Sequence, residues 1–155
     1  MITPVPTFTP LPAGTLTAAR AVIGLPCPLP LMAWPVRAGF ASPAEDYIEA
    51  RLDLNDLLSS QPEATFFVRV RGRSMVKAGI DDGDLLVVNR ALQATHGDII
   101  IAVVDGDHTV KRLHAQGGIV RLVAESDEHP SIHLVEGQTL EVWGVVTSVI
   151  KQFRQ

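Results

Sequence analysis

Residues 99–113 have the sequence IIIAVVDGDHTVKRL, and this stretch decides the fold. The run Ile99–Val104 is continuously apolar and of strand length, and Asp105-Gly106 is typical of a two-residue hairpin turn. With the turn at this position, strand pairing places Ile100 opposite Lys111. The sequence therefore predicts an antiparallel hairpin in which a lysine is held among apolar residues.

Both faces of this predicted hairpin are apolar, as in a strand that is covered on both sides. Lys111 shares its face with Ile100, Ala102 and Thr109, and the other face carries Ile101, Val103 and Val110. Apolar neighbours disfavour the ammonium form, so the pKa of such a lysine falls, and a neutral lysine can accept a proton. Taken alone, the hairpin favours a simpler alternative, an edge lysine whose ammonium reaches water.

The rest of the chain after residue 44 is typical of short strands with turns between them. Further strands are expected at residues 66–71, 85–88, 118–123 and 140–150, and residues 52–59 have about two turns of helical character. This pattern predicts an all-β fold, a compact and mostly antiparallel β-barrel or sandwich.

The first 44 residues differ from the rest in composition. Nine of the 11 prolines lie at or before Pro43, and the only charged side chains before Glu45 are Arg20 and Arg37. Proline excludes a long helix or a central strand. We therefore predict two parts, an extended proline-rich N-terminal arm (residues 1–44) and a β-rich domain (residues 45–155). The arm is too apolar for a solvated linker, so we expect it to lie against the folded domain or a partner subunit.

Composition also excludes several classes of function. The formal net charge of the 155-residue chain is −4, which disfavours direct binding to nucleic acid. The one cysteine, Cys27, cannot form an intramolecular disulfide, so we expect a reducing, cytoplasmic location. Four prolines interrupt the apolar stretch 21–35, so no membrane segment is expected. No motif predicts a cofactor or a metal; His129 and His133 are four apart, but Pro130 between them argues against a helical zinc site.

Ser74 is the candidate nucleophile. It follows the predicted strand 66–71, and Gly72 just before it permits unusual dihedral angles. Backbone N–H groups at such a turn can bind a developing oxyanion. Taken alone, however, this segment favours a serine that hydrogen-bonds its own backbone in a turn.

The combination of segments is more specific than any one of them. These segments are Ala38-Gly39-Phe40, Ser42-Pro43-Ala44, Asp46-Tyr47-Ile48-Glu49, Leu52-Asp53-Leu54-Asn55, Gly72-x-Ser74-Met75, Gly79-Ile80-x-Asp82-Gly83-Asp84-Leu85-Leu86, His96-Gly97-Asp98-Ile99, Val104-Asp105-Gly106, Thr109-Val110-Lys111 and Gly144-Val145-Val146. Through them, from about Ala38 to Arg154, the chain resembles the UmuD-like members of the LexA-type self-cleaving Ser/Lys peptidases. The spacing from serine to lysine also matches that family.

The resemblance implies a self-cleaving serine endopeptidase of the SOS response to DNA damage. Ser74 would be the nucleophile, Lys111 the general base, and Ala38-Gly39 the scissile pair. A RecA filament on single-stranded DNA would stimulate the cut. The truncated product would form a homodimer that serves as accessory subunit of an error-prone Y-family DNA polymerase for translesion synthesis. Two alternatives stay open: a non-catalytic polymerase-binding module, and a trans-acting protease similar to signal peptidases.

Overall fold

The computed structural model describes residues 18–20, 24–32, 48–135 and 137–153, and about half of these residues lie in strands. The helical elements are short: α1 (Leu54–Leu58) and the 3-10 helices η1 (Pro62–Ala64) and η2 (Val76–Ala78). Strands dominate the described residues, so the predicted all-β class is confirmed. The strands are β1 (Ala18–Arg20), β2 (Pro28–Met32), β3 (Ile48–Asp53), β4 (Thr65–Arg69), β5 (Leu85–Asn89), β6 (Ile99–Val104), β7 (Asp107–Gln116), β8 (Ile119–Val123), β9 (Ile132–His133) and β10 (Leu140–Ile150).

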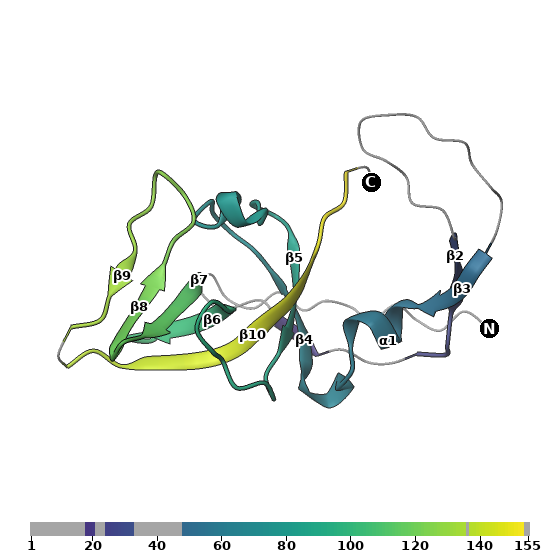
Figure 1. The fold of residues 1–155 in the computed structure, drawn as a ribbon, viewed down its shortest axis with the longest axis horizontal. Helices are drawn as coiled ribbons and strands as arrows, with labels where there is room; N and C mark the ends of the chain where they lie inside the picture. Colours follow the sequence, from purple (N-terminus) through teal and green to yellow (C-terminus); the bar gives the residue numbers. More distant parts are fainter. Residues whose placement is uncertain (1–17, 21–23, 33–47, 136, 154–155) are drawn as a thin grey trace.

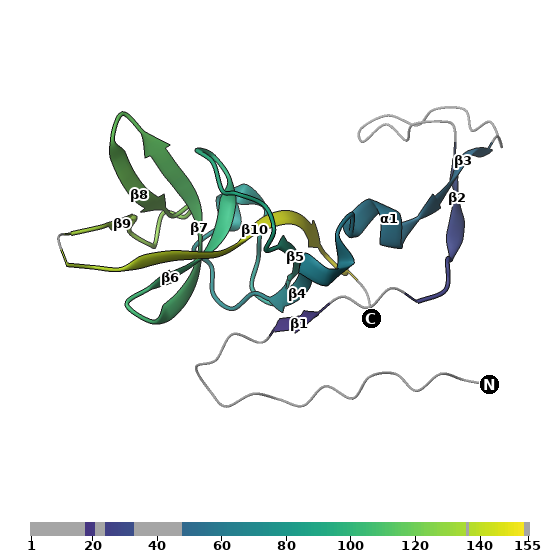
Figure 2. The same ribbon diagram turned by 90° about the horizontal axis from the view of Figure 1, so that it is seen from below.

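Eight of these strands form one antiparallel sheet in the order β1-β4-β5-β10-β6-β7-β8-β9. The long central strand β10 pairs with β6 through its first half and with β5 through its second half. The sheet twists strongly about β10, so β6–β9 and β4–β5 lie on either side of it (Figure 1). β2 and β3 form a separate two-stranded ladder at the far end of the molecule from β7 in both ribbon views (Figures 1 and 2).

The hairpin predicted from residues 99–113 is confirmed. β6 pairs with β7 in the expected register, with Ile100 opposite Lys111. The turn residues Asp105 and Gly106 have φ angles of 50° and 91°. Positive φ at both central residues is what a type I′ hairpin turn requires, and this turn matches the natural twist of the strands.

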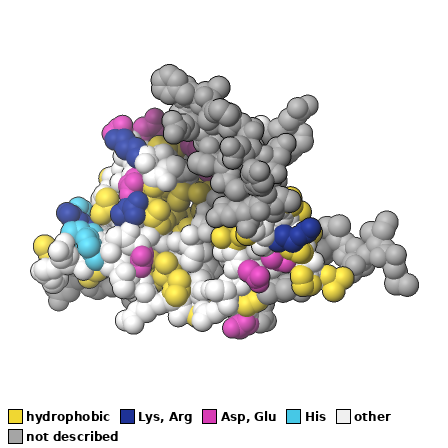
Figure 3. All heavy atoms as spheres, turned by 45° about the vertical axis from the view of Figure 1, so that its right-hand side comes forward, with side chains coloured by type: hydrophobic (Ala, Val, Ile, Leu, Met, Phe, Trp, Pro, Cys, Tyr) yellow, Lys and Arg dark blue, Asp and Glu magenta, His cyan; other side chains and the backbone are white. Residues whose placement is uncertain are grey.

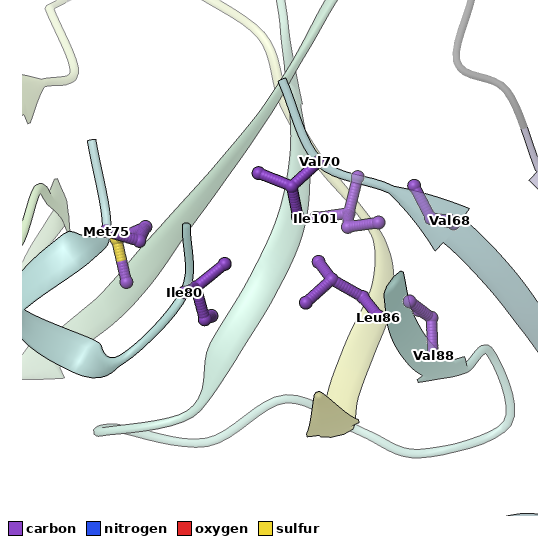
Figure 4. Close-up of a cluster of buried hydrophobic side chains, with 7 residues drawn as sticks. All are labelled: Val68, Val70, Met75, Ile80, Leu86, Val88 and Ile101. Carbon is purple, nitrogen blue, oxygen red and sulfur yellow. The ribbon is translucent and has the colours of Figure 1, made fainter. Parts of the chain in front are cut away.

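The core lies on both sides of β6, because successive strand residues point to opposite faces. Ile100 belongs to a cluster with Leu113 and Leu122, and Ile101 belongs to a second cluster, shown in Figure 4. Ile100 and Ile101 are both fully buried. The expectation that this strand is covered on both sides is therefore confirmed. The second cluster consists of Val68, Val70, Met75, Ile80, Leu86, Val88 and Ile101.

Gly144 in β10 permits close contact between β10 and β5. A Cβ built there would lie 2.6 Å from Val88 Cγ1 and 3.3 Å from the Asn89 carbonyl oxygen. We expect Gly144→Ala to lower the free energy of unfolding by about 1–3 kcal/mol, because the core must shift to admit the methyl group. Chemical denaturation checks this, with Gly24→Ala as control, since Gly24 has open space around it. Equal effects of the two substitutions would contradict the expectation.

Two short segments of the predicted arm are strands. β1 adds to the edge of the main sheet by pairing with β4, and β2 pairs with β3. The arm was expected to lie against the folded domain or a partner subunit. β1 lies against the folded domain. The predicted boundary at residues 44 and 45 lies outside the described residues and stays a prediction.

Candidate functional site

Ser74 and Lys111 meet, although 37 positions separate them in the chain. The Lys111 Nζ lies 2.9 Å from the Ser74 Oγ, within hydrogen-bond distance. The same nitrogen lies 2.7 Å from the Thr109 Oγ1 and 3.1 Å from the Val110 carbonyl oxygen. The amine therefore has three oxygen neighbours at hydrogen-bonding range.

A neutral amine can satisfy the three neighbours with its lone pair facing the serine. The Val110 carbonyl and the Thr109 hydroxyl can accept from its two N–H groups. In that protonation state the Ser74 hydroxyl can donate its proton to the lone pair, whereas an ammonium would donate to Ser74 instead. This is the contact that a general base needs before it takes the proton.

Lys111 differs from the other two lysines of the chain in having no acidic partner among the described residues. Lys77 pairs with Asp127, and Lys151 pairs with Asp81 and Asp84. Hydrogen bonds to Asp81 and Asp84 raise the pKa of Lys151. Lys111 forms no ion pair with any described carboxylate.

Burial changes the pKa of Lys111 in the opposite direction. Its side chain is 6% exposed, and desolvation lowers its pKa from the ordinary 10.5. The hairpin alone had favoured an edge lysine with its ammonium in water, and that alternative is wrong. β7 is an interior strand of the sheet, between β6 and β8, and the two hydrophobic clusters flank it.

The turn that carries Ser74 is fixed from both sides. Gly72 has a φ of 94°, which favours glycine, and its N–H donates to Asp82 Oδ1 at 2.6 Å. On the other side, the Glu125 N–H donates to the Ser74 carbonyl oxygen at 2.8 Å. Met75 then inserts its side chain into the core at 2% exposure. The backbone on both sides of Ser74 is thus held in place.

Two backbone N–H groups, those of Ser74 and Met75, lie at this turn next to the Ser74 hydroxyl. Within the described part of the chain, neither the Ser74 nor the Met75 N–H donates a hydrogen bond. Adjacent free donors beside a nucleophile are the arrangement that stabilises a tetrahedral intermediate. The alternative of a turn serine that merely satisfies its own backbone is not what the structure has, because the Ser74 hydroxyl contacts Lys111.

Thr109 is a part of the site to which the residue patterns assigned no role. The sequence spacing could have indicated this role, because Thr109 lies two positions before Lys111 and on the same face of β7. We expect Thr109→Val to slow self-cleavage about two- to tenfold, because it removes one hydrogen bond to the Lys111 amine. The substitution should also shift the pH dependence of the rate. Thr109→Ser keeps the hydroxyl and should restore the rate. If the valine variant cuts as fast as the wild type, Thr109 does not position the amine.

Other candidates from the sequence fall outside this site. Ala38 and Gly39 lie outside the described residues. His133 lies in β9 and His129 in the preceding loop. Over the described ranges, no group of three or more His, Cys, Asp or Glu side chains could hold a metal ion. No helix in this part of the chain is long and apolar enough to cross a membrane.

Comparison with known proteins agrees with the geometry. The model of the family "Peptidase S24-like" matches residues 30–147. Protein ImpA of Salmonella typhimurium is 46% identical over 127 residues, which cover 81% of this chain and 86% of that protein. Protein MucA of Salmonella typhimurium is 40% identical, covering 72% of this chain and 77% of that protein. The LexA repressor of Azoarcus sp. (strain BH72) is 40% identical, covering 75% of this chain and 57% of the repressor.

Proposed function

Because the chain belongs to the peptidase S24-like family, as a UmuD-like, LexA-type self-cleaving serine peptidase of the SOS response, we propose that Ser74 is its nucleophile and Lys111 its general base. We propose further that the bond cut is Ala38-Gly39. One observation carries the assignment: a buried amine, with no acidic partner in the described part of the chain, lies 2.9 Å from a serine hydroxyl. A Ser-Lys pair of this kind can replace the serine–histidine pair of other serine peptidases.

The reaction follows from the contacts. Neutral Lys111 takes the proton of Ser74, and the Ser74 oxygen attacks the Ala38 carbonyl carbon. The N–H groups of Ser74 and Met75 hold the resulting oxyanion. The C–N bond then breaks, and Lys111 gives its proton to the departing Gly39 amine. Water hydrolyses the ester on Ser74, which leaves a free carboxylate at Ala38 and restores the serine.

The proposed scissile pair lies, in the sequence, between two strands that pair with each other. Met32 at the end of β2 pairs with Ile48 at the start of β3, so residues 33–47 begin and end at this ladder. The ladder lies away from β7 in both ribbon views (Figures 1 and 2). We propose that the cleavable form is a different, less populated arrangement. We propose that a RecA filament on single-stranded DNA favours that arrangement, which is a population shift.

The cut product is proposed to act as a homodimer with a Y-family DNA polymerase during translesion synthesis in the cytoplasm. Residues 1–38 carry Arg20 and Arg37 and no acid, so their loss takes the formal net charge from −4 to −6. Direct binding to nucleic acid is not expected of so acidic a product. On the face drawn in Figure 3, basic side chains are scattered among acidic ones. The exposed free thiol of Cys27 supports a reducing compartment.

The mass of the fragments tests the proposed scissile bond. Incubation of the purified chain at alkaline pH, which deprotonates Lys111, should yield residues 1–38 and 39–155. Ala38→Trp should suppress both fragments, because a large side chain beside the scissile carbonyl keeps it from Ser74. Ala44→Trp is the matched control in the same segment and should leave them. Fragments that end at another residue would contradict the proposed bond.

A further inference from the structure

The first strand of the molecule covers an edge of the main sheet, and it lies on the N-terminal side of the proposed cut. We propose that self-cleavage frees this edge, β4, as a docking site for an extended, acidic segment of a partner protein. The inference rests on the proposed cut between Ala38 and Gly39. It concerns the strand edge that the cut exposes. Hydrogen exchange in an uncut chain distinguishes a failure of this inference from a failure of the proposed cut.

The covering contact is short and lies at the end of the sheet. β1 is the outermost strand next to β4, and its register joins Ala18 to Val68, Ala19 to Phe67 and Arg20 to Phe66. The other side of β4 pairs with β5 over all five of its residues. β4 therefore stays in the sheet when β1 leaves, and its outward backbone N–H and C=O groups lose their partners.

The cut weakens the hold of β1 on β4. Apart from the chain itself, the described contacts that tie residues 1–38 to the rest are the pairing of β1 with β4, the contact of β1 with η1, the ladder of β2 with β3, and the hydrogen bond from the Cys27 N–H to Asp53. While the chain is intact, connection through residues 33–47 keeps β1 at a high local concentration. After the cut that advantage is lost, and a three-residue strand pairing and a two-stranded ladder are each marginal in water.

β4 is the better docking edge of the two that the sheet has. The opposite edge, β9, has two residues, whereas β4 has five. An uncovered edge strand of this length is a template for the backbone of an added strand. The edge is also ordered by the core, since Val68 is 1% exposed and Thr65 is 1% exposed.

The charges beside β4 indicate the chemistry of the partner. Arg69 ends the strand, and Arg71 and Arg73 follow it; all three are exposed. None of the three forms an ion pair with a residue in the described ranges. A strand that extends the register of β1 past Ala18 places its preceding positions beside Arg69 and Arg71. Acidic side chains at those positions would complement the arginines, with modest pairing energy at an exposed site.

A labelled peptide with the sequence of residues 14–24 probes the edge directly. We expect it to bind the self-cleaved wild-type chain but not the intact Ser74→Ala chain, as measured by fluorescence anisotropy. Glutamate in place of Thr15 and Thr17 of the peptide should tighten binding severalfold over lysine at the same positions. Arg69→Ala with Arg71→Ala should remove that preference. Equal binding to cleaved and intact chains, or to acidic and basic peptides, would overturn the proposal.

Hydrogen exchange in an uncut chain separates this inference from the peptidase assignment. In the Ser74→Ala chain, Ala19→Pro removes a backbone donor from β1, and amides of Thr65–Arg69 should then exchange faster. Leu25→Pro, between the two ladders, is the control and should leave β4 unchanged. Unchanged exchange with Ala19→Pro would overturn the covering role of β1. If exchange is faster but the wild-type chain is never cut, β1 does cover β4. Cleavage is then not what uncovers β4, and the proposed function is overturned as well.

Discussion

Ser74→Ala should abolish self-cleavage, with the rate falling on the order of 10⁴-fold or more, because it removes the hydroxyl that contacts the proposed base Lys111. The Ser74 hydroxyl is the only serine oxygen that contacts Lys111 Nζ within the described residues. The methyl side chain of alanine fits the same turn, which the backbone bonds of Gly72 and Glu125 still hold. The chain should therefore fold and stay uncut. Gel or mass analysis after alkaline incubation measures this.

Ser59→Ala is the matched control for the loss of a serine hydroxyl. Ser59 is 8% exposed, and its Oγ has no hydrogen-bond partner in the described structure, so it contributes nothing to the dyad. This variant should cut at the wild-type rate. A Ser74→Ala chain that still releases a fragment beginning at Gly39 would rule out Ser74 as the nucleophile.

Lys111→Met should slow self-cleavage roughly 10²–10⁴-fold, the usual contribution of a general base. Methionine keeps an unbranched apolar stem but has no basic nitrogen, so the proton of Ser74 has no acceptor. Lys111→Arg should fail as well, because a guanidinium stays protonated. Lys77→Met is the control, since Lys77 pairs with Asp127 at the surface. A Lys111→Met chain that cuts within a few fold of wild type would refute the role of this amine.

The same substitution has a stability signature that shows whether the lost activity is mere unfolding. Burial lowers the pKa of folded Lys111 below the 10.5 of the unfolded chain, so the unfolded state binds more protons between these values. The contribution of Lys111 to the free energy of unfolding therefore rises with pH across that window and is unfavourable below it. Lys111→Met removes this dependence. Denaturation at neutral and alkaline pH should show a smaller rise for the variant than for the wild type.

The local structure around the lysine could be predicted from sequence because it depends on near neighbours. Asp105-Gly106 specified the turn, the turn specified the register, and the register placed Lys111 opposite Ile100 in a hairpin with two apolar faces. The residues alone could not show that β7 is an interior strand. That depends on the addition of β8, which the sequence patterns predicted only as a separate strand.

The contacts between distant segments could not be predicted from residue patterns. The pairing of Ser74 with Lys111 brings together a turn and a strand 37 positions apart, and only the family resemblance suggested it. The hydrogen bond from the Glu125 N–H to the Ser74 carbonyl is a backbone contact, so no particular side chain is needed to form it and the sequence does not indicate it. β1 is three residues long, which is too short for a periodic pattern to predict.

The pH dependence of the self-cleavage rate tests the central claim most directly. If a neutral Lys111 is the base, the rate constant should rise about tenfold per pH unit from neutral pH and level off at a pH below 10.5, where the buried amine is fully deprotonated. Lys111→Met should lack this rise. A wild-type rate that does not change with pH, or that still climbs beyond the ordinary pKa of lysine, would contradict the account.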